Sequence, residues 1–109
     1  MSTISTHVLD TALGKPAAGI RVTLERGDAV VGDGVTDADG RARDLHANDA
    51  SLAAGDYRLT FAVGEYFAAA SRESFYSEIV VNFRVDSDEG HYHVPLLLSP
   101  YGYSTYRGS

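Results

Sequence analysis

The chain has 109 residues, of which 44% are hydrophobic and 22% are charged, and this composition is typical of one globular domain spanning residues 1–109. Its formal net charge of −6 leaves no basic surface to neutralise phosphates, so we expect no nucleic-acid partner. The chain has no cysteine, which excludes disulfides, thiolate metal sites and cysteine nucleophiles.

The N-terminal residues 1–7 contain neither a basic segment nor a long apolar run, so they do not resemble a signal peptide. No stretch of the sequence is long and apolar enough to span a membrane. From these two observations we expect no membrane partner and a cytoplasmic location.

Alternation of apolar and polar residues predicts strands through the first half of the chain. Ile4, Thr6 and Val8 fall on one face of the first strand, and a turn-like stretch covers residues 10–19. Further strands, separated by tight turns, are predicted over residues 20–25, 29–35 and 41–45. A loop that includes a helical turn is expected over residues 46–55.

The second half continues the alternating pattern, with strands predicted over residues 57–63, 79–85, 91–98 and 103–107. One helix of about two turns is expected over Tyr66 to Glu73, after the fifth strand, because this segment is rich in helix formers. The acids Asp86, Asp88 and Glu89 are interpreted as a solvated turn, since a calcium site needs more oxygen ligands at a defined spacing. Short strands separated by turns predict an all-β fold, an eight-stranded β-sandwich of two sheets.

His91 and His93 lie two residues apart in a predicted strand and therefore share a face. Three interpretations are open: a metal-binding pair, an acid/base site, or solvated strand histidines. No acidic residue follows at ligand spacing, so the metal interpretation is the least favoured and we expect no metal site.

Four other residues have ordinary structural interpretations when each is taken alone. His7 would be a strand histidine, Arg41 a solvated turn residue, and Tyr103 and Tyr106 packing aromatics. However, residues 106–109 (Tyr-Arg-Gly-Ser) place polar groups beside an apolar strand, which suggests that the C-terminal segment is part of a site rather than a frayed tail.

The stretch from His91 to Ser109 resembles the signature of the 5-hydroxyisourate hydrolases, the transthyretin-like proteins of purine catabolism. Residues 5–10 together with residues 14–17 resemble the first motif of that family. Intermediate motifs match residues 39–41, 55–58 and 74–79, so the resemblance covers essentially the whole chain. The terminal Tyr-Arg-Gly-Ser is the most specific motif, because the hormone-carrying transthyretins lack it.

The resemblance implies an eight-stranded sandwich with one short helix after the fifth strand, assembled as a homotetramer with sites at the interface between dimers. It implies hydrolytic ring opening of 5-hydroxyisourate to 2-oxo-4-hydroxy-4-carboxy-5-ureidoimidazoline in urate degradation, without a cofactor or metal. Carried over by position, the catalytic residues would be His7, Arg41 and His93, and the residues that bind the substrate would be His7, Arg41, Tyr103, Tyr106, Arg107 and Ser109.

Two points stay open at the level of the sequence. Which histidine activates water is not decided, although His7 is favoured, with His93 orienting it or relaying the proton. His91 matches the family with a less clear, supporting role. The main alternative function is a non-enzymatic, transthyretin-like carrier of small ligands, which would share the fold but would favour an apolar channel. An immunoglobulin-like interaction module is a third interpretation, which gives no reason for a functional C-terminal segment.

Overall fold

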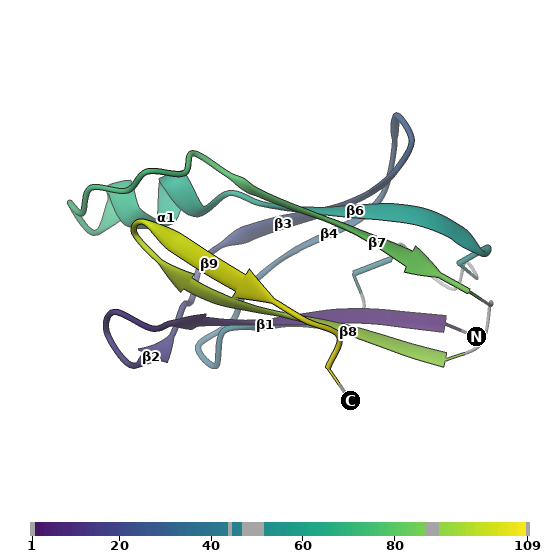
Figure 1. The fold of residues 1–109 in the computed structure, drawn as a ribbon, viewed down its shortest axis with the longest axis horizontal. Coiled ribbons are helices and arrows are strands. Elements are labelled where there is room, and N and C mark those ends of the chain that lie inside the picture. Colours follow the sequence, from purple (N-terminus) through teal and green to yellow (C-terminus); the bar gives the residue numbers. More distant parts are fainter. Residues whose placement is uncertain (1, 44, 47–51, 87–89, 109) are drawn as a thin grey trace.

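The computed structural model describes residues 2–43, 45–46, 52–86 and 90–108, and their strands form two sheets that pack face to face (Figure 1). One sheet has the order β4-β3-β6-β7, formed by β3 (Arg21–Arg26), β4 (Ala29–Val35), β6 (Gly55–Phe61) and β7 (Ile79–Val85). The other sheet has the order β2-β1-β8-β9, with β5 also paired to β1, and consists of β1 (Ser2–Asp10), β2 (Lys15–Pro16), β5 (Arg41–Ala42), β8 (Gly90–Ser99) and β9 (Gly102–Thr105).

The predicted alternation decides which side chains fill the space between the sheets. Ile4, Val8, Leu96 and Leu98 face inward from β1 and β8 and are fully buried. The opposite sheet contributes fully buried side chains from alternate positions, among them Val22, Leu24, Leu59 and Phe61. The two-sheet all-β fold predicted from the sequence is therefore confirmed, whereas the single-domain assignment for residues 1–109 stays a prediction.

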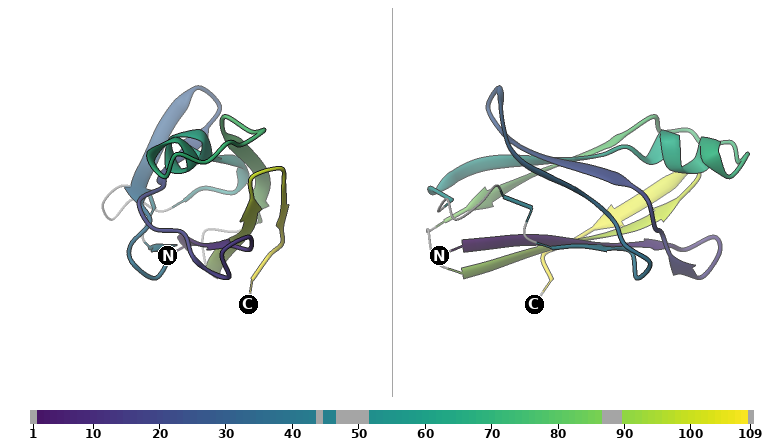
Figure 2. Two further views of the ribbon diagram at one scale, coloured as in Figure 1. Left: turned by 90° about the vertical axis from the view of Figure 1, so that its left-hand side faces the viewer. Right: turned by 180° about the vertical axis from the view of Figure 1, so that it is seen from behind.

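The strands β1 and β8 pair in parallel over nine residues, although they come from opposite ends of the chain. The pairing places Ser5 opposite His93 and His7 opposite Pro95. Because directly opposed residues in a sheet share a face, these four residues all lie on the outer face, away from the core. Figure 2 shows this sheet from two further sides, with the segment after β9 leaving it on the outer side.

Several predicted strand boundaries differ from the structure. The strand predicted over 57–63 covers Gly55–Phe61, because Val63 is the first residue of the helix. Lys15–Pro16 forms β2 inside the predicted turn, because the chain folds back and pairs with the end of β1. The strand predicted over 41–45 is limited to Arg41–Ala42, and the strand predicted over 103–107 ends at Thr105. With the two-residue strands included, the described residues form nine strands, one more than the eight predicted.

The only helix among the described residues, α1, covers Val63–Ala69 rather than the predicted 66–73. Its position is set by burial, because Val63 and Phe67 are one turn apart and both face the core. The helix ends before Ser71, which adopts a left-handed backbone with φ of 56°. No helix in the described parts of the chain is long and apolar enough to cross a membrane. Residues 47–51 of the loop predicted to include a helical turn, and residues 87–89 of the predicted acidic turn, lie outside the described residues.

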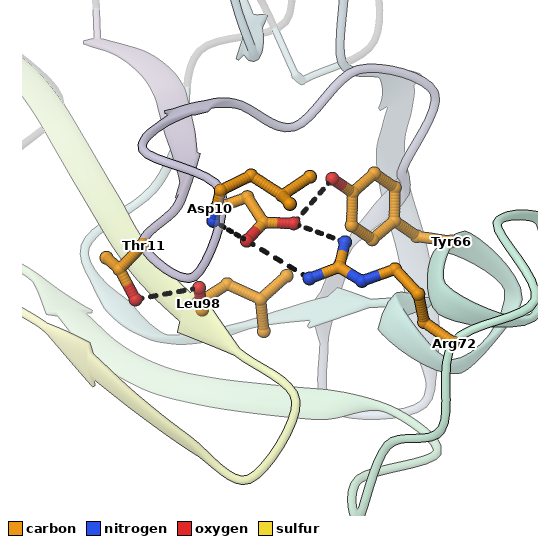
Figure 3. A network of polar contacts seen from close by, with 6 residues as sticks. Asp10, Thr11, Tyr66, Arg72 and Leu98 are labelled. Atoms are coloured by element: carbon orange, nitrogen blue, oxygen red, sulfur yellow. Dashed lines mark hydrogen bonds and ion pairs between the residues drawn. The ribbon is translucent and has the colours of Figure 1, made fainter.

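A buried carboxylate fixes the end of β1 (Figure 3). The Asp10 side chain is fully buried, and its Oδ2 accepts hydrogen bonds of 2.7 Å from both the Tyr66 hydroxyl and the Arg72 guanidinium. Burial alone would raise the pKa of Asp10, but the bonds from Arg72, Tyr66 and the Leu13 amide outweigh it, and the pKa is lowered below 3.8. This network ties α1 and the segment after it to the sheet that carries β1.

We expect the Asp10→Asn substitution to lower the free energy of unfolding at pH 7 by about 2–4 kcal/mol, because it leaves the Arg72 guanidinium without its buried counter-ion. Urea unfolding at a fixed protein concentration measures the change. Glu65→Gln is the control, since the Arg21–Glu65 ion pair is solvent-exposed and its loss should change stability little.

The same comparison has a pH dependence of known sign. The pKa of Asp10 is lower in the folded than in the unfolded protein. Its contribution to the free energy of unfolding is therefore complete above pH 3.8 and is lost as the pH falls through the lower, folded-state pKa. The difference between wild type and Asp10→Asn should therefore shrink below pH 3.8. A difference that stays constant down to pH 2 would contradict this assignment.

Candidate active site

Three neighbouring strands bring the predicted catalytic residues to one face. His7 on β1 lies directly opposite Arg41 on β5, and Ser5, two residues before His7, lies opposite His93 on β8. Since side chains two residues apart on a strand share a face, His7, Arg41 and His93 all belong to the outer face of the five-stranded sheet. The sequence placed His91 and His93 on one face, and the strand pairing adds Arg41 and His7 to it.

The turn before β5 positions Arg41 as the first residue of that strand. Asp37 Oδ1 accepts hydrogen bonds from the backbone amides of Arg41 (3.0 Å) and Asp39 (2.9 Å), and these bonds lower the pKa of Asp37. Gly40 adopts φ of 76° and its carbonyl accepts a 2.7 Å bond from the Val8 amide. A Cβ at Gly40 would lie 2.3 Å from the Val8 carbonyl oxygen, so only glycine fits this close approach to β1.

The His93 imidazole is half-buried and held by a hydroxyl. Ser5 Oγ is hydrogen-bonded to Nδ1 of His93 at 2.8 Å. The pKa of His93 is lowered below its ordinary 6.5, first by burial and then by the neighbouring positive charges of His91, Arg41 and His7. The imidazole is therefore neutral at pH 7, which is the form that can accept a proton.

A polar cavity of about 300 Å³ opens beside His93. It is lined by Thr3, Ser5, Thr6, Arg41, Arg43, His91 and His93. His7 is not part of this lining, although it neighbours Arg41 on the same face. Among the described residues no group of three or more histidine or acidic side chains is arranged to hold a metal ion.

A second cavity, of about 310 Å³, lies on the other side of His93, between β7, β8 and the segment after β9. It is more apolar, and its lining includes Phe83, Tyr92, His93, Tyr106 and Arg107. The Arg107 guanidinium carbon lies 4.7 Å from the centre of the Tyr92 ring, a cation–π contact that anchors the C-terminal segment. His93 thus stands between the two cavities.

The C-terminal segment lies against the His93 ring. Although β9 ends at Thr105, the Gly108 amide still donates a 2.8 Å hydrogen bond to the His93 carbonyl. A Cβ at Gly108 would lie 2.5 Å from Cδ2 of His93, so the absence of a side chain allows the segment to approach the imidazole this closely.

The structure brings some predicted residues together and leaves others apart. Tyr106 lines the apolar cavity beside His93. Tyr103 lies opposite the buried Leu98 and packs edge-to-face on Tyr76 at 5.2 Å, so within one chain it does not join the group around Arg41. Ser109, predicted to bind substrate, lies outside the described residues.

Sequence reasoning assigned no site role to four residues that line the polar cavity, namely Thr3, Ser5, Thr6 and Arg43. The alternation did place Ser5 on the same face as His7, which is the signal that could have identified it. What alternation alone does not reveal is that β8 lies next to β1.

Comparison with known proteins agrees with these observations. Residues 4–108 match the model of the HIUase/Transthyretin family. The chain belongs to this family. This member is 50% identical, over 117 aligned positions, to the 5-hydroxyisourate hydrolase of Caulobacter vibrioides, with 100% of both chains covered.

Two solved structures resemble the chain closely. The 5-hydroxyisourate hydrolase of Klebsiella pneumoniae matches with a TM-score of 0.89 and 45% identity, covering 100% of this chain and 94% of that one. Sea bream transthyretin in complex with thyroxine matches with a TM-score of 0.87 and 29% identity, covering 96% and 93% of the two chains. Because an enzyme and a thyroxine-bound protein fit nearly equally well, function must be argued from the site rather than the fold.

We expect His93 to titrate below pH 6.5 in the folded protein, and the His91→Gln substitution to raise its pKa because one neighbouring positive charge is removed. An NMR titration of the imidazole protons measures both values. Lys15→Gln, which removes a positive charge from β2 in the same sheet, is the control and should leave the His93 titration unchanged. A wild-type value above 6.5 would contradict the neutral imidazole.

Proposed function

We propose that this protein is a 5-hydroxyisourate hydrolase, which uses water to open the six-membered ring of 5-hydroxyisourate. The product would be 2-oxo-4-hydroxy-4-carboxy-5-ureidoimidazoline, as in urate degradation. The observation that carries the proposal is the polar cavity in which His93 and Arg41 meet, in a chain 50% identical to a relative of the same activity. A carrier of apolar ligands would gain nothing from an arginine and an imidazole placed there.

The proposed chemistry follows from the properties of each side chain. His93, neutral at pH 7, accepts a proton from water as the water oxygen attacks the ring carbonyl carbon. The planar guanidinium of Arg41 binds the carbonyl oxygen and stabilises the negative charge that develops on it. His7, beside Arg41, gives a proton to the ring nitrogen as the carbon–nitrogen bond breaks, and it regains this proton from solvent before the next turnover.

We expect Arg41→Ala to lower kcat/KM by about 10²–10³-fold, the usual effect of removing one donor to a developing oxyanion. His7→Asn should lower it by about 10²-fold or more, because the variant has no imidazole to give a proton to the ring nitrogen. The substrate is generated in situ from urate with urate oxidase, and its near-ultraviolet decay is followed with and without the protein.

Arg21→Ala is the matched control, because Arg21 is an exposed arginine on the other sheet and should not affect turnover. Near-normal turnover of Arg41→Ala or His7→Asn, at equal concentrations of folded protein, would remove the role given to that residue. A wild-type protein that does not accelerate the decay would overturn the hydrolase assignment itself.

The C-terminal segment should matter through its contact with His93. We expect Gly108→Ala to lower kcat at least tenfold, because the new methyl group would displace either the imidazole or the segment. Gly102→Ala is the matched control: its Cβ would meet nothing closer than Ser99 Oγ at 3.8 Å. Equal activity of the two variants would show that the contact at Gly108 does not contribute to turnover.

We also propose that the protein is a homotetramer with its sites at the interface between dimers. The polar cavity opens on the outer face of a sheet, where a second chain could cover it. Large exposed apolar and aromatic side chains support association, namely Leu13, Phe75, Tyr101, Tyr103 and Tyr106. Light scattering would give the mass in solution, and cell fractionation would test the cytoplasmic location, which stays a prediction.

A further inference from the structure

Hydroxyl and imidazole groups alternate along the outer face of the β1–β8 pair. Thr3 lies directly opposite His91, and Ser5 lies directly opposite His93. Thr3 Oγ1 is hydrogen-bonded to Nδ1 of His91. Ser5 Oγ is hydrogen-bonded both to Nε2 of His91 at 3.2 Å and to Nδ1 of His93 at 2.8 Å. The four side chains therefore form one continuous row of hydrogen bonds.

The Ser5 hydroxyl is the necessary link in this row. The rings of His91 and His93 are nearly parallel, with an interplanar angle of 13°, but their centres are 6.1 Å apart. Both ring nitrogens that face Ser5 are within hydrogen-bond distance of its oxygen, whereas no bond joins the two imidazoles directly among the described contacts. A hydroxyl both donates and accepts, so it can pass a proton from one imidazole to the other.

The two imidazoles of this hydrogen-bonded row differ in their exposure to solvent. Ser5 is buried, with 7% of its surface exposed, and His93 is half-buried between two cavities. His91 is exposed to solvent. The row therefore leads from the imidazole in the candidate site to an imidazole that can exchange protons with water.

We propose that Ser5 and His91 form a proton relay that carries the proton accepted by His93 during hydrolysis out to solvent. The inference rests on the proposed function, since it concerns the same reaction. Ser5 and His91 are positioning and relay residues that act through His93 and make no bond to the substrate.

The relay step balances without any further reactant. His93 accepts the proton from water at Nε2 and releases its Nδ1 proton to Ser5 Oγ. The Ser5 hydroxyl releases its own proton to Nε2 of His91, and His91 loses its Nδ1 proton to solvent near Thr3. Each group regains its original number of protons, while the orientation of the hydroxyl and the tautomers of the two rings reset by exchange with water.

The charges around His93 favour movement of the proton outward. Charged and titratable groups surround His93 on both sides. The polar side has His7 on β1, Arg41 and Arg43 at and after β5, and His91 on β8, and the apolar cavity has Arg84 on β7, Tyr92 on β8, and Tyr106 and Arg107 after β9. Burial lowers the pKa of His93, and so do His91, Arg41 and His7 when each carries a positive charge, so a proton on His93 is less stable than on an ordinary imidazole. The relay operates while His91 is neutral, since only the neutral ring has a nitrogen lone pair that can accept the proton. The His91 ring is exposed to solvent, whereas the His93 ring is half-buried.

The experiment compares Ser5→Ala, Ser5→Thr and His91→Gln in the 5-hydroxyisourate decay assay at low and high concentrations of imidazole buffer. We expect Ser5→Ala to lower kcat about tenfold or more with little change in KM, and Ser5→Thr, which keeps the hydroxyl, to retain most of the activity. His91→Gln should lower kcat at low buffer and recover as imidazole is added, because the buffer replaces the missing exposed ring. Wild type should show no dependence on buffer.

Thr11→Val is the matched control for loss of a hydroxyl between the same two segments, since Thr11 Oγ1 donates to the Leu98 carbonyl well away from His93. It should leave kcat and its buffer dependence unchanged. If Ser5 only supported the fold, Ser5→Ala would lower the fraction of folded protein. In that case the kcat of His91→Gln would not recover when imidazole is added.

The outcomes separate the relay from the proposed function. An active wild type with unchanged kcat in Ser5→Ala, or a His91→Gln variant whose reduced kcat does not respond to imidazole, overturns the relay and leaves the hydrolase assignment intact. A wild type that does not accelerate the decay at any buffer concentration overturns the proposed function, and the relay in that reaction with it.

Discussion

The parallel register between β1 and β8 is the constraint on which both the core and the candidate site depend. One face of this pair supplies Ile4, Val8 and Leu96 to the core, and the other face carries Ser5 opposite His93. Because side chains alternate with a period of two, a slip of one residue would turn the apolar face outward and bury the imidazole face. Selection for a packed core therefore also fixes the geometry of the site.

The C-terminal end of β1 has a structural role, whereas its N-terminal part carries residues of the candidate site. At its C-terminal end, buried Asp10 holds Arg72 and Tyr66 and so connects the sheet to α1 and the segment after it (Figure 3). Toward its N-terminal end, Ser5 and His7 carry the polar chemistry. A charged group is tolerated in the buried position because three donors satisfy it, while the imidazoles remain partly open to solvent, where they can exchange protons.

The alternation of apolar and polar residues predicted most of the strands and the face on which each residue lies. It could do so because successive side chains of a strand point to opposite faces, a local property of the backbone. It misplaced the helix, since the helix formers from Ala68 to Glu73 matter less than the burial of Val63 and Phe67, and Arg72 is drawn to Asp10. The candidate site was harder to predict from the residues alone. Ser5 and His93 are 88 positions apart, and no local pattern shows that their strands are neighbours; the family resemblance supplied His7, Arg41 and His93 as a group.

The C-terminal segment shows why a motif does not by itself assign a role to each of its residues. Pro95 has no N–H to donate, so regular pairing lapses after Thr105 and returns only where Gly108 bonds to His93. Arg107 turns inward over the Tyr92 ring, which makes it an anchor for the segment. Gly108 can then rest against Cδ2 of His93 while Ser5 holds Nδ1, so contacts on two edges orient the imidazole. An imidazole fixed in this way, with its charge suppressed by burial and by neighbouring cations, is prepared to accept a proton through chain contacts alone.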